Sequence, residues 1–167
     1  MIDERRKTPD VPGPEEWSGH NDVDARNVHA FWFGKSLDEV QQHFAGGQSI
    51  QRGDELLFMP RRAFQFYIFA FAQYVMSEAA IGDAGGASAF LGFLTARETD
   101  DPGSVAQIYD QLEPTIEFVA ESQARFAADH DVHGDFREKA AELARLCGRE
   151  FEPPGPLDQM LDPTDDA

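Results

Sequence analysis

Apolar side chains are most concentrated between residues 56 and 76, a stretch that contains seven aromatic rings. From residue 63 to residue 76 the apolar positions cover nearly every side of a helix. Pro60 suits the first position of a helix, and Gly82 is typical of a position just past its end. A helix that is apolar on almost every side is usually buried. The pattern therefore predicts a core helix over about residues 60–80, with its rings in a protein core rather than lining a cofactor pocket.

Three other helices are indicated by residues that commonly cap a helix N-terminus. Ser36, with a glutamate three residues later, predicts a short helix to about residue 44 that two glycines end. Asp135, also with a glutamate three residues later, predicts a helix that closes at Gly148. Ser104, with a glutamine three residues later, is predicted to cap the third helix.

The longest periodic segment runs from residue 104 to about residue 128, with apolar side chains at steps of three and four residues. Pro114 lies inside this segment, and an interior proline removes one helical hydrogen bond and crowds the preceding turn. A kink or a break is therefore expected near Leu112. A further short helix is expected over residues 87–97, after a flexible glycine-rich linker at residues 82–86.

Strands have little support in this chain. No segment alternates apolar and polar residues between turn signals, although residues 56–59 could form a short strand. We therefore predict an all-α fold, a compact single-domain bundle of about five or six helices around the buried aromatic helix. Residues 20–148 are expected to form this domain. Residues 1–19 and 149–167 are rich in Pro, Asp and Glu, which predicts a flexible N-terminal tail and an acidic, proline-rich C-terminal tail.

The net charge of the chain limits the classes of molecule that it is expected to bind. Among 167 residues, 31 acidic and 14 basic side chains give a formal net charge of -17 and a pI near 4.4. Such a field repels nucleic acid and anionic membranes, and it attracts a basic protein. The apolar run at residues 63–76 is also too short to cross a bilayer, which takes about 20 consecutive apolar residues. We expect no nucleic-acid and no membrane partner.

The single cysteine, Cys147, cannot form an intramolecular disulfide. The N-terminal residues are charged and interrupted by prolines, which is unlike a signal peptide. Both features favour the cytoplasm as the location. Neither feature indicates an oligomeric state.

Acidic residues are concentrated between residues 98 and 121, where no basic residue occurs. Four of them recur at steps of three and four residues, which places them along one helix face, opposite the apolar face. Like charges at that spacing repel, which supports a cationic partner, while an ordinary solvated face is the alternative that most charge runs represent. We predict that a basic partner binds the seven carboxylates of this region, Glu98, Asp100, Asp101, Asp110, Glu113, Glu117 and Glu121.

Candidate chemistry is sparse. Residues 129–133, with the sequence DHDVH, hold side chains that ligate zinc or manganese, but no distant second pair of ligands accompanies them. A polar loop beside a helix end explains this cluster as well, so we expect no metal site and no cofactor. Arg61 and Arg62, at a helix N-terminus, and Tyr67 are candidate contacts for an anion or another ligand. No nucleophile motif is present, which favours a protein that is not an enzyme.

A resemblance adds to this interpretation. The segments FWFGKSLDEV, LLFMPRRAFQFYIFAF and ASAFL occur in this order and resemble an uncharacterised family of small acidic bacterial cytosolic proteins. The family's core-helix motif, P-x-x-A-F-x-F-Y, is matched by Pro60, Ala63, Phe64, Phe66 and Tyr67. The similarity covers about residues 30–128 and implies a compact domain of unknown role, and the resemblance brings no catalytic residues to carry over. Toxin-neutralising immunity proteins are similar in type, being small, acidic and cytosolic.

Two functional hypotheses follow. The first is a non-catalytic, immunity-like interaction domain that presents the carboxylate-rich helix face to a basic partner protein. The second is a small-molecule binding protein or an enzyme with a pocket beside the aromatic helix at residues 60–80. That pocket would require polar groups to converge on a cavity, for example Arg61, Arg62 and Tyr67.

Overall fold

Helices are the regular elements of the part of the chain that the computed structural model describes, residues 11–18 and 23–151, and no strand occurs in that part. The predicted all-α fold is therefore confirmed. Six of the helices are eight residues or longer, α1 and the five that form the layers below, and they surround a large aromatic core. Residues 56–59 form the end of a helix and the turn after it, so the short strand considered there is wrong.

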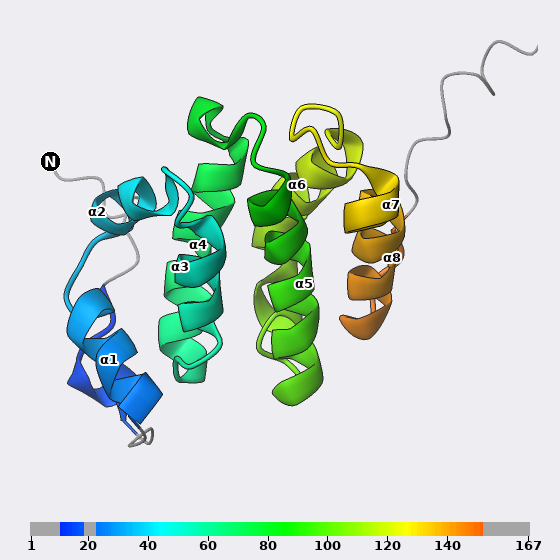
Figure 1. The fold of residues 1–167 in the computed structure, drawn as a ribbon. Helices are drawn as coiled ribbons and strands as arrows, with labels where there is room; N and C mark the ends of the chain where they lie inside the picture. The colour runs from blue at the N-terminus through cyan, green and yellow to red at the C-terminus, as the bar shows by residue number, and fades with distance from the viewer. Residues whose placement is uncertain (1–10, 19–22, 152–167) are drawn as a thin grey trace, which may run out of the picture.

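Five helices form two layers. Their bounds are Ser49–Leu56 (α3), Arg61–Met76 (α4), Ala84–Asp100 (α5), Tyr109–Glu121 (α6) and Phe136–Leu146 (α8). Figure 1 shows α3, α5 and α8 side by side in one layer, with α4 and α6 in the layer behind them. The chain alternates between the layers, so each helix packs against helices that are close to it in sequence.

Shorter elements complete the fold. The N-terminal ones are η2 (Pro14–Trp17), α1 (Val23–Trp32), α2 (Leu37–Gln41) and η3 (Gln42–Phe44), and those further on are η4 (Glu78–Ala80), η5 (Ala106–Ile108) and α7 (His130–His133). In Figure 1, α1 and α2 lie at one end of the two layers and α8 lies at the other end. Both η2 and α2 pack against α4.

Helix α4 is the central element, as predicted. Nine of its sixteen residues are buried, among them Phe64, Tyr67 and Phe71 with no exposed surface. It ends at Met76, earlier than predicted, because Ser77 is extended and η4 follows. Its apolar surface is also not buried all round, since Phe66 and Phe69 on its outer side are only partly covered.

Two of the three predicted caps are correct. Ser36 forms a capping box at the start of α2, and the Asp135 side chain accepts a hydrogen bond at the start of α8. The predicted cap at Ser104 is wrong, because the Ser104 hydroxyl donates to Asp101 at 2.7 Å and α6 begins only at Tyr109. The Ser104 hydroxyl therefore bonds to a nearby charged side chain instead of to the first backbone amides of a helix.

The break considered near Leu112 is wrong, whereas the kink considered there stays a prediction. Helix α6 is continuous through Pro114 and ends at Glu121, well before the predicted residue 128. Pro114 lies on the exposed side of the helix, as does Asp110, whose carbonyl loses its helical partner. Water can bond to that carbonyl, and this lowers the cost of the proline.

The predicted flexible linker at residues 82–86 is a fixed connection. Asp83 caps α5, and its carboxylate accepts hydrogen bonds from Ser49 Oγ at 2.6 Å, Tyr74 Oη at 2.8 Å and Gly86 N at 3.0 Å. A Cβ atom on Gly86 would lie 2.2 Å from the Asp83 carboxylate and 2.5 Å from Ser49 Oγ. Glycine is therefore required for this contact between α3, α4 and α5.

Parts of both predicted tails are described and pack on the domain. Within residues 1–19, the described residues 11–18 include Trp17, which is 7% exposed and joins the core. Within residues 149–167, Phe151 is partly buried against the core and Arg149 pairs with Asp110. Residues 1–10, 19–22 and 152–167 lie outside the described residues.

Candidate functional site

The acidic residues of α6 lie along one side of the helix. Leu112, Ile116 and Val119 are fully buried on the opposite side, as predicted from the spacing. We call the four carboxylates the α6 stripe: Asp110, Glu113, Glu117 and Glu121. Glu113 is half-buried and the other three are exposed. The stripe is held by a rigid backbone, because α6 packs against both α4 and α8.

Among the described residues, one ion pair involves the α6 stripe. Arg149 pairs with Asp110 at 3.2 Å, and the described residues provide no ion pair for Glu113, Glu117 or Glu121. Other basic side chains are used within the fold: Arg52 bonds to Glu55, Arg61 to Asp101, Arg97 to backbone carbonyls, Arg125 to the Ser77 carbonyl and Lys139 to Ser88. The carboxylates of the stripe therefore remain largely uncompensated.

The stripe also acts on a buried group beneath it. The pKa of Tyr109 is raised to about 12, chiefly by burial and to a smaller extent by nearby negative charges that include Glu113 and Glu117. The Tyr109 hydroxyl has no hydrogen-bond partner among the described residues.

Glu98 belongs to the fold rather than to an exposed acidic surface. It is 5% exposed, and its carboxylate accepts hydrogen bonds from the backbone of Gly103 and Val105 at 2.7 Å and of Ala106 at 3.1 Å. These bonds hold the loop between α5 and α6. Glu98 is therefore not accessible to a partner in this conformation.

Asp101 is also engaged inside the molecule. Arg61 donates through Nε to the Asp101 carboxylate at 3.0 Å and through Nη2 to its other oxygen. The bonds from Arg61 and Ser104 hold the pKa of Asp101 well below its usual range. Asp100, the seventh predicted carboxylate, is exposed at the end of α5.

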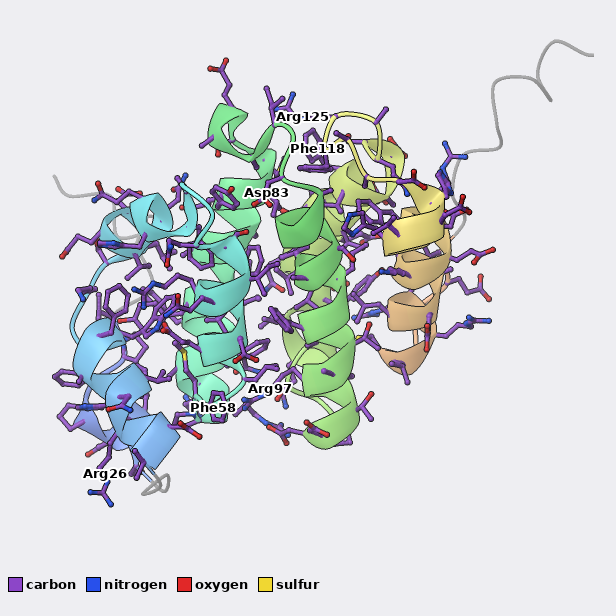
Figure 2. All side chains as sticks on the ribbon, viewed as in Figure 1. Arg26, Phe58, Asp83, Arg97, Phe118 and Arg125 are labelled. Carbon is purple, nitrogen blue, oxygen red and sulfur yellow. The ribbon has the colours of Figure 1, made fainter. Side chains whose placement is uncertain are left out.

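Arg97 completes this cluster between the helices. It is 7% exposed and donates to the Met59 carbonyl at 2.7 Å and to Ser104 Oγ at 3.1 Å. Its guanidinium carbon lies 4.8 Å from the centre of the Phe64 ring. Figure 2 shows Arg97 and Asp83 toward opposite ends of α5, so each end of that helix is bound to its neighbours.

The three predicted ligand contacts are separated. Tyr67 is buried, and its hydroxyl lies 2.7 Å from the Trp32 carbonyl and 2.8 Å from the Lys35 carbonyl. Burial raises the pKa of Tyr67 to about 12. Arg61 is bound to Asp101. Of the three predicted ligand contacts, Arg62 is exposed and lines a surface depression.

That depression is an open groove of about 720 Å³ along the partly covered side of α4, and residues 11–16, the start of α2, η5 and the start of α6 also line it. Phe66 and Phe69 on α4 are apolar parts of its surface. The remaining lining residues are Val11, Pro12, Glu16, Leu37, Arg62, Gln65, Gln73, Ile108 and Gln111. We call this depression the α4–α6 groove.

The spacing of polar residues on α4 also marks the groove in the sequence. Gln65 and Gln73 interrupt the apolar run of α4, and together with Arg62, Phe66 and Phe69 they recur at helical spacing. This set marks one side of α4 as less buried than the rest. The second hypothesis, a small-molecule site beside this helix, stays a prediction, and of its three named residues the groove includes Arg62.

The histidine cluster at residues 129–133 forms the short helix α7, which the Asp129 side chain caps. Within residues 11–18 and 23–151, no group of three or more His, Cys, Asp or Glu side chains is placed to hold a metal ion. In the same part of the chain, no helix has the length and the apolar character needed to cross a membrane.

Comparisons of the chain with protein-family models, with curated proteins and with solved structures found no match. The resemblance of residues 30–128 to a family of bacterial proteins therefore stays a prediction.

Proposed function

We propose that this protein is a non-catalytic interaction domain, of the same type as immunity proteins, and that it binds a basic protein through the α6 stripe. One observation carries the proposal. Glu113, Glu117 and Glu121 follow one another along a continuous helix, and no described cation pairs with them. Each step of four residues advances about 6 Å along a helix axis, so a partner can place several cations along this row.

Electrostatics would act mainly on the rate of association. Complementary charge steers an approaching partner and can raise the association rate by one or more orders of magnitude at low salt. Exposed ion pairs contribute little affinity each, about 0.2–1 kcal/mol. The stripe would therefore provide attraction and orientation, and other contacts would have to provide most of the binding free energy.

A charge-reversal experiment tests the stripe. Glu113, Glu117 and Glu121 are replaced with lysine, and the association rate of a lysine-rich, glycine-spaced peptide is measured by stopped-flow fluorescence across a salt series. We expect the rate to fall about tenfold or more at low salt, and its salt dependence to weaken.

A matched variant controls for net charge. Asp54, Glu78 and Glu142 are exposed and lie on α3, η4 and α8, and their replacement with lysine changes the net charge by the same amount. If both triple variants slow association equally, the peptide responds to total charge and the α6 stripe is an ordinary solvated face. Circular dichroism verifies that both variants remain folded.

A further inference from the structure

We propose that the α4–α6 groove receives the apolar side of a basic amphipathic helix, whose cationic side contacts the α6 stripe. This inference rests on the proposed function and deepens it, because it names the chemistry of the partner segment. The occupant we infer is part of the basic partner, rather than a second copy of this chain or a small apolar molecule.

The dimensions of the groove suit a helix. Its α4 side extends from Arg62 to Gln73, and eleven residues of helix correspond to about 16 Å or three turns. Phe66 and Phe69 lie along this length on the partly covered side of α4. Exposed apolar grooves of this kind bind amphipathic helices through side chains spaced at three, four and seven residues.

The sides of the groove combine apolar walls with unused polar groups. Leu37 and Ile108 are further apolar residues of the groove lining, and both are only partly buried. The described residues provide no hydrogen-bond partner for the side chains of Gln73 and Gln111, which therefore have amide donors and acceptors to offer. An apolar floor with polar edges is typical of a binding surface.

The α6 stripe determines the charge of the proposed occupant. Successive helix residues are turned by about 100°, so Pro114 and Phe118 lie between Gln111, at the groove, and the carboxylates of the stripe. A helix with its side chains is about 10–12 Å in diameter, so a bound helix lies within reach of both sides of α6. Lysine and arginine side chains of the occupant can therefore extend across Pro114 to the stripe.

The other occupants are less consistent with the charges. Two copies of a chain with a net charge of -17 repel each other, which disfavours a homodimer through this face. A small apolar molecule would leave the α6 stripe unpaired. Both remain as outcomes of the experiment below, and either would overturn the proposal.

The test uses designed peptides and the unmodified protein. The probe is an 18-residue helix-forming peptide of leucine, lysine and one tryptophan in amphipathic order, and its control has the same composition in a scrambled order. We expect the amphipathic peptide to bind about tenfold more tightly by fluorescence titration, which corresponds to about 1.4 kcal/mol. Amide shifts in NMR spectra should change mainly at residues of α4 and α6 that line the groove.

Variants then separate the groove from the stripe. Replacing Phe66 and Phe69 with alanine should reduce the affinity for the amphipathic peptide to that for the scrambled one. Replacing Phe33 with alanine should leave both affinities unchanged, because Phe33 is 39% exposed in the turn after α1 and lies outside the groove. The shift changes in the unmodified protein keep the test valid if the double variant is too unstable to use.

The outcomes distinguish the two proposals. If reversal of the stripe weakens both peptides while the Phe66 and Phe69 variants change neither, the groove inference is wrong and the proposed function stands. If the groove variants weaken the amphipathic peptide while reversal of the stripe has no effect, the proposed function is wrong. An uncharged leucine and glutamine analogue that binds equally well, or a dimer that the groove variants dissociate in sedimentation experiments, overturns the inference.

Discussion

At the scale of single residues, two glycines inside helices illustrate opposite roles. Gly53 on α3 faces the core, where a Cβ atom would lie 2.3 Å from the Phe71 ring and 2.8 Å from the Phe93 ring. Gly92 on α5 is exposed, and a Cβ atom there would have no atom within 4 Å. The same substitution should therefore have opposite effects at the two positions.

We expect Gly53→Ala to lower the free energy of unfolding by about 1–3 kcal/mol, because the added methyl group overpacks two aromatic rings. Gly92→Ala should raise it by about 0.5–1 kcal/mol, because alanine is the better helix former and nothing obstructs its methyl group. Urea denaturation of both variants measures the difference. Equal effects at the two positions would contradict the close packing of α3 against the ring of Phe71.

Arg97 and Glu98 show why part of the candidate site could not be predicted from the sequence. Both are adjacent charged residues near the end of a helix, a position that is usually exposed. Arg97 is buried because it donates to the Met59 carbonyl, which lies far away in the sequence. Glu98 is buried because it accepts a hydrogen bond from the Val105 amide in the following loop. The spacing on α6 did predict the stripe, because a helical period alone separates its carboxylates from the buried side.

At the scale of helices, sequence patterns within one helix predicted its position and its caps. Contacts between helices could not be predicted from the sequence. The apolar run of α4 and the caps at Ser36 and Asp135 depend on local sequence, and each was predictable. The fixed connection at Asp83 depends on side chains from three helices, so its glycines resembled a linker. Local propensity cannot reveal a hydrogen bond whose acceptor and donor are 34 residues apart.

The central position of α4 makes a prediction about its rings. Phe71 is fully buried and packs against Phe44 and Phe90, with ring centres 4.8 Å and 5.4 Å away. We expect Phe71→Ala to lower the free energy of unfolding by about 3–5 kcal/mol, because it leaves a cavity between α4 and its neighbours. Phe66→Ala on the groove side should cost clearly less. Comparable losses for both in urea denaturation would mean that the groove side of α4 is as buried as its core side.

At the scale of the whole molecule, buried acidic groups link stability to alkaline pH. Folding raises the pKa of Cys147 from 9.0 to about 11, chiefly by burial. It raises the pKa of Tyr67 and of Tyr109 from 10.0 to about 12, for the same main reason. The folded state therefore holds these protons more tightly than the unfolded chain does.

A group with a raised pKa contributes its stability fully below the pKa of the unfolded chain and loses it as the pH rises through the folded value. We expect the free energy of unfolding to fall steadily from about pH 9 to pH 12. Urea denaturation at one-unit intervals measures the decline. A Cys147→Ala variant should lose the part of the decline that begins at the lowest pH, and an unchanged profile in that variant would contradict the burial of the thiol.

The alternation of the chain between two layers has a consequence for how the protein is made. Helices α3 to α6 follow one another between the layers, and each packs against a helix that precedes it in the chain. Synthesis adds about 5–20 residues per second from the N-terminus, so N-terminal segments emerge first. Each new helix of this protein therefore meets a partner that has already left the ribosome. The core around α4 can begin to assemble before α8 emerges from the ribosome, and α8 then packs against α5 and α6.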